Sequence, residues 1–363
     1  MSNGRFLIVK PSSLGDVLHA FPAVAALCRE SGAKADWLIH PAFSPLLKYM
    51  PCVENAILFQ RKKLGKISSF FPAYRELKKD LRKNQYDAVI DLQGLFRSAL
   101  IAKQAKAPYH AGPEKPREGI AKLFYNKHFS QDPGIHALLK NNQAVAHFLG
   151  KKTDEIDFSF TLPVVEENLQ SANALLENAG ISPDQKNCLI GLAPGARWIT
   201  KQWKAEFFAE LVSELKKRIP AAHFVLLGTS DDIPAADTII SLCGNAPHVT
   251  SLCGKTTLGD LLELTRMCTL FVSNDSGPMH IAAALDVPVL ALFGPTDPVL
   301  TGPFTERKTI LQPENVSCIR CMKRQCADMR CQDAVSPVNA ADRAVAMIRN
   351  DLARKNINII EEK

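Results

Sequence analysis

Short apolar runs that alternate with helical patterns constrain this chain more than any other feature. Residues 6–9 read as a buried strand, a turn follows, and residues 16–30 carry apolar side chains at helical spacing. Uninterrupted apolar strands between helices indicate a parallel sheet that is covered on both faces. The pattern begins again near residue 188. The sequence therefore predicts an α/β fold built on two such sheets.

A chain of 363 residues is long enough for two domains. We expect a first α/β domain over residues 1–165 and a second over 188–335, joined by a linker at 166–187 that contains a helical pattern. Residues 336–363 predict a C-terminal helix that can pack back on the N-terminal domain. The carboxyl ends of the strands are then the edges at which ligands are expected.

The N-terminal segment shows an apolar run without a cleavage site, and the longest later apolar stretch, residues 281–293, is interrupted by Asp286 and Pro288. These features predict a cytoplasmic protein, in which thiols stay reduced. The ten cysteines then favour buried thiols or metal ligands over disulfides.

Charge is unevenly distributed along the chain. Residues 1–165 carry 24 Lys and Arg against 14 Asp and Glu, a formal charge of +10, whereas the remainder carries 20 against 23, a charge of −3. The excess in the first half suggests an anionic partner: nucleic acid, an acidic membrane surface, or a phosphorylated and carboxylated substrate. A solvated basic face, as at residues 78–83, is the alternative explanation.

Residues 273–280 read SNDSGPMH and join a predicted strand to a predicted helix. The free amides of Ser276 and Gly277, together with the helix dipole, make a natural site for a phosphate. Asp275 is better suited to sugar hydroxyls, and His280 can donate to either group. The alternative is an ordinary helix cap made by Asp275 or Ser276.

Two further polar turns follow strands of the second sheet. Residues 195–203 supply Arg197, Thr200 and Lys201, which suit the neutralisation of a diphosphate, and residues 293–298 follow a neighbouring strand. Neither a GxGxxG fingerprint nor a GxxxxGK[ST] loop is present, which disfavours a dinucleotide oxidoreductase and a P-loop NTPase.

In the first domain, Asp16 stands at the start of a predicted helix directly after the first strand and its turn. A carboxylate in this place is a candidate general base. The alternative is that Asp16 caps the helix.

Four thiols, those of Cys318, Cys321, Cys326 and Cys331, lie within fourteen residues. In a reducing compartment this density suggests a structural zinc or iron site with four thiolate ligands. Four free thiols in a loop are the alternative.

The segments 6–22, 91–98, 191–203, and 272–284 with 293–298 together resemble glycosyltransferase family 9, the ADP-heptose:lipopolysaccharide heptosyltransferases. Within that family, residues 116–126 are most similar to heptosyltransferase I, which adds the first heptose to the Kdo of the inner core. The resemblance implies a GT-B fold, in which two Rossmann-like domains face each other across a cleft. It also implies an acceptor-binding first domain, a donor-binding second domain, and inverting transfer that requires no metal cofactor.

The resemblance also implies roles for individual residues. It places Asp16 as the catalytic base and Thr200 and Lys201 at the diphosphate. One of Asp231 and Asp232 takes the place of a carboxylate that meets the ribose, with the register open between them. The remaining residues divide between the donor, with Arg197, Asp232, Asp275, Ser276, Gly277 and His280, and the acceptor, with Ser13, Gly15, Arg61, Arg97 and Arg117.

The implied partners are the donor ADP-L-glycero-D-manno-heptose, the acceptor Kdo-lipid A and, peripherally, the cytoplasmic face of the inner membrane, without nucleic acid. The cysteine cluster occurs only in some members, so the acceptor stays open. A second core heptose and a serine of an autotransporter protein are alternatives in the same enzyme class. A non-catalytic metal-thiolate protein that binds nucleic acid is a third alternative.

Overall fold

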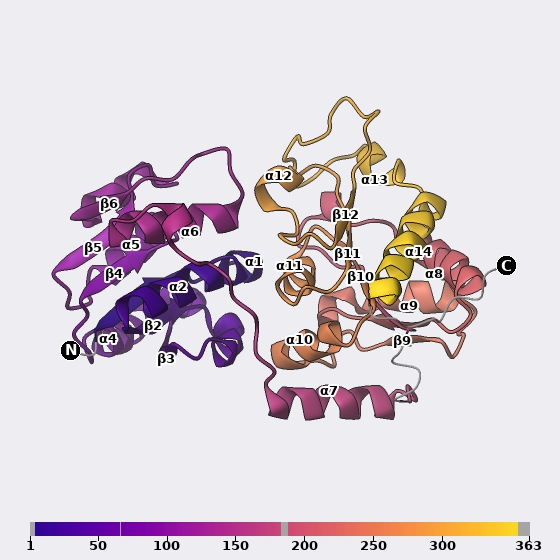
Figure 1. Ribbon diagram of the computed structural model, residues 1–363, viewed down its shortest axis with the longest axis horizontal. Helices are drawn as coiled ribbons and strands as arrows, with labels where there is room; N and C mark the ends of the chain where they lie inside the picture. Colours follow the sequence, from indigo (N-terminus) through magenta and orange to yellow (C-terminus); the bar gives the residue numbers. More distant parts are fainter. Residues whose placement is uncertain (1–3, 66, 183–187, 355–363) are drawn as a thin grey trace. The chain divides into compact units, whose positions relative to one another are not determined.

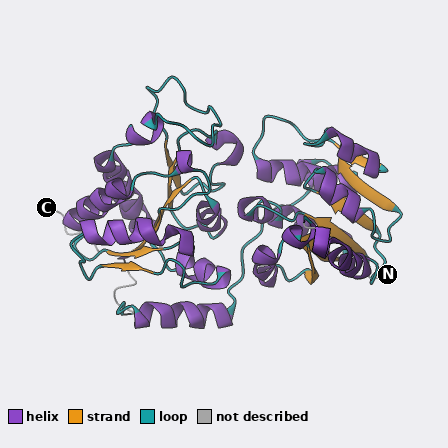
Figure 2. Cartoon of the chain, turned by 180° about the vertical axis from the view of Figure 1, so that it is seen from behind, coloured by secondary structure: helices purple, strands orange, loops and turns teal. Residues whose placement is uncertain are grey.

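The computed structural model describes residues 4–65, 67–182 and 188–354, and divides the chain into two compact units, 1–163 and 164–363 (Figure 1). Each unit contains one six-stranded sheet with helices on both of its faces, as Figure 2 shows. No helix within the described ranges is both long enough and apolar enough to cross a membrane. The predicted α/β architecture with two parallel sheets is confirmed.

The sheet of the first unit has the strand order β3-β2-β1-β4-β5-β6, and its neighbouring strands pair in parallel. Its strands are β1 (Arg5–Val9), β2 (Lys34–Ile39), β3 (Val53–Leu58), β4 (Ala88–Asp91), β5 (Tyr109–Pro113) and β6 (Lys127–Phe129). Its α-helices are α1 (Leu14–Leu18), α2 (Phe21–Ser31), α3 (Arg61–Leu64), α4 (Ile67–Leu81), α5 (Phe96–Ala102) and α6 (Ala137–Leu149). Shorter 3-10 segments are η1 (Pro41–Tyr49), η2 (Gly119–Phe124) and η3 (Thr153–Glu155).

Strand β1 shows why its sheet needs two layers of helices. Successive side chains of a strand point to opposite faces. Leu7 and Val9 share one hydrophobic cluster with side chains of α4 and α5, whereas the ring of Phe6 packs edge-on against that of Phe148 in α6. An unbroken apolar strand is therefore buried on both sides.

The second unit repeats this plan with the strand order β12-β11-β10-β7-β8-β9. Its strands are β7 (Leu189–Ala193), β8 (His223–Leu226), β9 (Val249–Ser251), β10 (Leu270–Asn274), β11 (Val289–Leu292) and β12 (Lys308–Leu311). Its helices are α7 (Glu166–Asn178), α8 (Ala205–Arg218), α9 (Ile233–Leu242), α10 (Leu258–Arg266), α11 (Gly277–Ala284), α12 (Pro298–Thr301), α13 (Arg330–Asp333) and α14 (Pro337–Arg354), with the 3-10 turns η5 (Ile199–Lys201) and η6 (Ser230–Asp232).

The boundaries differ from the expected ones in two places. The predicted linker contains α7, which packs against α10 and buries Ala172 and Leu176 in the second core, so the division falls after Pro163. The C-terminal helix α14 also belongs to the second unit, where Ala344 and Ile348 are buried against α8 and the sheet; the expectation that it packs back on the N-terminal domain is corrected. Residues 183–187 and 355–363 of these two predicted segments lie outside the described part.

The strand order fixes where a ligand is expected in each unit. In the first unit the chain runs outward from β1 to β2 in one direction and from β4 to β5 in the other. In the second unit β7 and β10 stand in the same relation. Loops diverge at such switch points and leave a crevice at the carboxyl ends of the two central strands. The turns after β1 and β4, and those after β7 and β10, are therefore the places to look for chemistry.

Candidate active site

The switch point of the first unit is bridged by Lys10, which follows β1 directly. Its side chain is buried, and Nζ donates a hydrogen bond of 2.6 Å to the carbonyl oxygen of Leu92, the first residue after β4. Burial lowers the pKa of Lys10, while the negative charges of Asp16 and Asp91 oppose that shift. Lys10 was not among the predicted site residues. Its position at the end of an apolar strand was the signal that sequence reasoning missed.

Asp16 lies in α1 and takes part in a capping box. Its Oδ2 accepts hydrogen bonds from the backbone amide of Ser13 at 2.7 Å and from the Ser13 hydroxyl at 2.8 Å. The helix-cap alternative is therefore observed. The cap is compatible with a role of Asp16 as a base, because both donors are neutral. The Asp16 side chain is half-buried and interacts electrostatically with Lys10. Gly15, also predicted, is buried within α1.

The turn after β4 is organised by Asp91. Its carboxylate accepts hydrogen bonds from the amides of Gln93 and Gly94, at 2.8 and 3.1 Å, and from the hydroxyl of Tyr125 at 2.8 Å. Burial raises the pKa of Asp91, and these donors oppose the shift. Asp91 thereby fixes the shape of the turn that lines the adjacent pocket.

That pocket, of about 390 Å³, brings two predicted acceptor residues together: Arg61 of α3 and Arg97 of α5 both line it. Ser12, from the turn between β1 and α1, and Gln93, from the turn after β4, line it as well. Arg117, the third predicted residue, is exposed and contributes to the electrostatics at Lys10. The carboxylate of Glu118 lines the pocket with Arg61 and Arg97, which leaves a net positive lining, and the pocket opens next to the turn that precedes α1.

In the second unit, Asn274 at the end of β10 joins the two turns of the switch point. Its Nδ2 donates to the carbonyl oxygen of Pro194 at 2.6 Å, and its Oδ1 accepts from the amide of Trp203 at 3.1 Å. The amide of one buried side chain therefore holds both ends of the turn that follows β7.

Lys201 and Asp275, predicted separately from two turns, form an ion pair. Lys201 Nζ lies 2.7 Å from Asp275 Oδ2, and the side chains are 17% and 5% exposed. The same carboxylate oxygen accepts a hydrogen bond from Thr296 Oγ1 in the turn after β11. A residue from each of three neighbouring strand ends thus meets at one point.

Helix α11 begins immediately beside this pair. Ser276 is its N-cap residue, and its side chain makes no capping hydrogen bond, so the alternative of a cap by Ser276 is not observed. The Ser276 hydroxyl instead lies 3.3 Å from that of Ser273. His280, nearly buried, follows Gly277 by three residues and so lies on the same side of α11. The anion site at this helix end stays a prediction.

The two candidate ribose carboxylates differ in their surroundings. Asp232 packs against both glycines of the neighbouring turns: a Cβ on Gly195 would stand 1.9 Å from its Oδ1, and one on Gly228 2.6 Å from its Oδ2. Asp232 Oδ2 also accepts hydrogen bonds from the amide and hydroxyl of Thr229. Asp231 is exposed. Asp232 is therefore the residue that reaches the turn after β7.

Comparison with known proteins points to one family. The model of glycosyltransferase family 9 (heptosyltransferase) matches residues 74–331. The chain belongs to glycosyltransferase family 9. Lipopolysaccharide heptosyltransferase 1 of Pseudomonas aeruginosa is 30% identical over 338 residues, which cover 89% of this chain and 87% of that protein.

Other relatives of this family 9 enzyme are named as heptosyltransferases with a different number. Lipopolysaccharide heptosyltransferase 2 of Salmonella typhimurium is 28% identical, over 85% of this chain and 88% of that protein. Among solved structures, Escherichia coli heptosyltransferase WaaC with ADP aligns with a TM-score of 0.75 at 24% identity, over 95% of this chain and 99% of that one. The GT-B fold expected from the sequence is confirmed.

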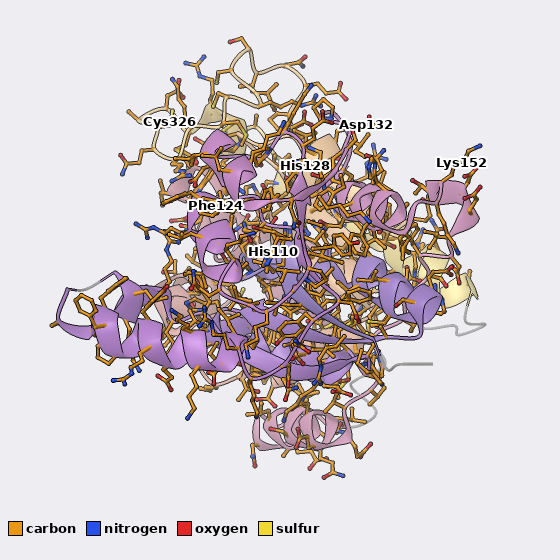
Figure 3. All side chains as sticks on the ribbon, turned by 90° about the vertical axis from the view of Figure 1, so that its left-hand side faces the viewer. His110, Phe124, His128, Asp132, Lys152 and Cys326 are labelled. Atoms are coloured by element: carbon orange, nitrogen blue, oxygen red, sulfur yellow. The ribbon has the colours of Figure 1, made fainter. Side chains whose placement is uncertain are left out.

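The four predicted thiols of this family 9 enzyme share the segment between β12 and the end of α13. Cys318, Cys321 and Cys326 are exposed, whereas Cys331 is buried in α13; Cys326, labelled in Figure 3, lies on a stretch without helix or strand. Burial raises the pKa of the Cys331 thiol, and the charges of the other three thiols add to that shift. Among the described residues no three ligand side chains converge on one point, so the geometry shows no assembled metal site, and the metal stays a prediction.

Two predicted donor residues differ from the others in their surroundings. Thr200 is buried, and its hydroxyl donates to the carbonyl oxygen of Lys323 at 2.7 Å, which ties it to the cysteine-containing segment. Arg197 is exposed. In the turn after β7, Thr200 is thus buried and hydrogen-bonded, whereas Arg197 is exposed to solvent.

Proposed function

We propose that this family 9 enzyme transfers heptose from ADP-L-glycero-D-manno-heptose to the Kdo of Kdo-lipid A, in the inner core of lipopolysaccharide. The second unit supports the donor half of this proposal through the Lys201–Asp275 pair beside the open end of α11. Backbone amides at a helix start and a neighbouring cation are the usual partners of phosphate.

The observation that carries the acceptor half is the pocket lined by Arg61 and Arg97. Guanidinium groups bind carboxylates and phosphates in a bidentate manner, and an inner-core acceptor carries both. The relative that is 30% identical is itself a lipopolysaccharide heptosyltransferase 1. The charge of +10 over residues 1–165 suits peripheral contact with the cytoplasmic face of an anionic membrane.

The proposed reaction is a single displacement with inversion. The acceptor hydroxyl oxygen forms a bond to the anomeric carbon, and the bond from that carbon to the β-phosphate oxygen breaks. ADP departs with the electron pair, and Asp16 receives the proton of the hydroxyl. Lys201 and the first amides of α11 stabilise the charge that develops on ADP. No step of this proposal passes through a metal.

Relatives named heptosyltransferase 2 and 3, at 28% and 29% identity, support a second candidate acceptor, a heptose already in the core. The test is release of ADP from ADP-heptose in the presence of Kdo-lipid A, followed by mass analysis of the lipid. Addition of one heptose is expected. Turnover only with a heptosylated core, or only with a protein serine, would mean that the proposed acceptor is wrong and that the enzyme class is right.

A further inference from the structure

The segment that carries three of the four cysteines, Cys318, Cys321 and Cys326, is bonded to two turns of the donor site. We call residues 316–329 the cysteine loop. The amide of Met322 donates to the carbonyl oxygen of Pro295 at 2.8 Å, in the turn after β11. The next residue, Lys323, offers its carbonyl oxygen to the Thr200 hydroxyl at 2.7 Å, in the turn after β7. The middle of the loop is thereby held between two turns of the switch point.

This attachment places Arg324 against the donor site. Its guanidinium carbon lies 4.9 Å from the ring centroid of Trp198, and Lys201 Nζ lies 4.6 Å from the same centroid. Aromatic faces attract cations at such distances. Trp198 therefore has two positive groups within cation–π distance, and one of them, Lys201, is paired with Asp275 directly before α11.

The charge balance at this point is incomplete. Asp275 neutralises Lys201, but no carboxylate of the described residues forms an ion pair with Arg324. A guanidinium carries five N–H donors and no acceptor, so its natural additional partner is an oxyanion. The ligand that the neighbouring groups favour is phosphate, because Arg324 shares the Trp198 ring with Lys201, and Lys201 lies at the start of α11 through its pair with Asp275.

We propose that Arg324 binds the diphosphate of the nucleotide sugar together with Lys201, with Trp198 as the platform that positions both cations. This inference rests on the proposed function, since it requires that the second unit binds the donor. It assigns the cysteine loop a part in substrate binding: the loop supplies one wall of the donor site and a charge that the turn after β7 does not itself provide.

The test measures binding of ADP, AMP and adenosine by calorimetry, without acceptor, to the full chain. Arg324→Ala is expected to weaken ADP binding about tenfold, because a hydrogen-bonded charge pair is lost from a partly exposed site. AMP, which lacks the β-phosphate, should lose less, and adenosine should bind as before. Arg324→Lys keeps the charge and loses the bidentate geometry. Its affinity for ADP should fall between those of the wild type and of Arg324→Ala.

A matched control is Arg330→Ala, which removes another arginine close to the cysteine loop, one paired with Asp328. It should leave ADP binding unchanged. Wild-type ADP affinity in Arg324→Ala would overturn the inference while the proposed function stands. Equal weakening of ADP and adenosine would also overturn it, since that result means a displaced loop and not a lost phosphate contact. Failure of the wild-type protein to bind ADP would instead overturn the donor assignment.

Discussion

The two switch points use the same residue types in different ways. In the first unit, Lys10 donates to a backbone carbonyl, and the carboxylate of Asp16 is held by the neutral donors of Ser13. In the second unit, Lys201 is bonded directly to the carboxylate of Asp275. A carboxylate held by neutral donors keeps a negative charge that can receive a proton. A carboxylate paired with a lysine is already compensated, and serves to position that lysine.

The strongest test of this difference is Asp16→Asn. Asparagine retains the size of the side chain and can still accept from Ser13, so α1 should keep its cap. Loss of the base should lower turnover by about 10²- to 10⁴-fold, with ADP affinity unchanged. The measurement is steady-state ADP release together with ADP calorimetry.

A matched control is Asp260→Asn. Asp260 forms the same capping box with Thr257 at the start of α10, where its Oδ2 accepts from the Thr257 amide at 2.8 Å and hydroxyl at 2.7 Å. This variant should turn over at the wild-type rate. If Asp16→Asn also did so, Asp16 would be a helix cap and no more.

The second unit is tested by Lys201→Ala. The variant removes a cation from the anion site and leaves Asp275 nearly buried without its partner, so both ADP affinity and stability should fall. We expect ADP binding to weaken about 10- to 100-fold. Lys204→Ala is the control, since Lys204 lies three residues away and pairs with Asp333. Equal ADP affinities of the two variants would contradict the assignment.

Gly195→Ala tests whether the turn after β7 and Asp232 form one surface. Its new Cβ would stand 1.9 Å from Asp232 Oδ1, so the carboxylate must move. We expect a loss of about 1–3 kcal/mol in unfolding free energy, as for other overpacked sites, and weaker ADP binding. Gly134→Ala, where nothing lies within 4 Å of the added carbon, should be neutral in chemical denaturation. A stable Gly195→Ala variant with normal affinity would show that Asp232 is not constrained there.

The smallest expected effect concerns acid stability, in which the units also differ. Burial lowers the pKa of His110 in β5 to about 4 from 6.5. Burial also lowers the pKa of His223 and His248 in the second unit, but these two side chains are only half-buried. The folded state keeps His110 neutral while the unfolded state takes up a proton, so stability is lost as pH falls from 6.5 to 4. We expect a loss of about 1–2 kcal/mol after allowance for partial solvation. His110→Gln should remove that part of the pH dependence in denaturation curves; an unchanged slope would contradict it.

The sequence predicted the elements that local patterns determine. The apolar strands and the polar turns after them located both sheets and, separately, Lys201 and Asp275, because parallel strands bring their carboxyl ends to one edge. That the two side chains pair was seen only in the structure. Lys10 was missed because a lysine after a strand usually reads as solvated. Whether it is buried depends on Leu92, which is distant in the chain.

The contacts of the cysteine loop could not be predicted for the same reason. Thr200 and Lys323 are 123 positions apart, and no local sequence pattern predicts to which distant carbonyl oxygen a hydroxyl donates. The linker was predicted around α7 because Pro163 and Pro183 flank it in the sequence. The buried side chains of α7 are Ala172 and Leu176. Their burial against α10 became visible only with the fold.

The two hydrogen bonds of Asn274 have a consequence for how the donor site can diverge among related enzymes. Because one amide holds residues on both sides of the turn after β7, insertions near Pro194 or Trp203 would separate it from one of them. A chimera that exchanges nucleotide specificity would have to transplant the turn and the asparagine together.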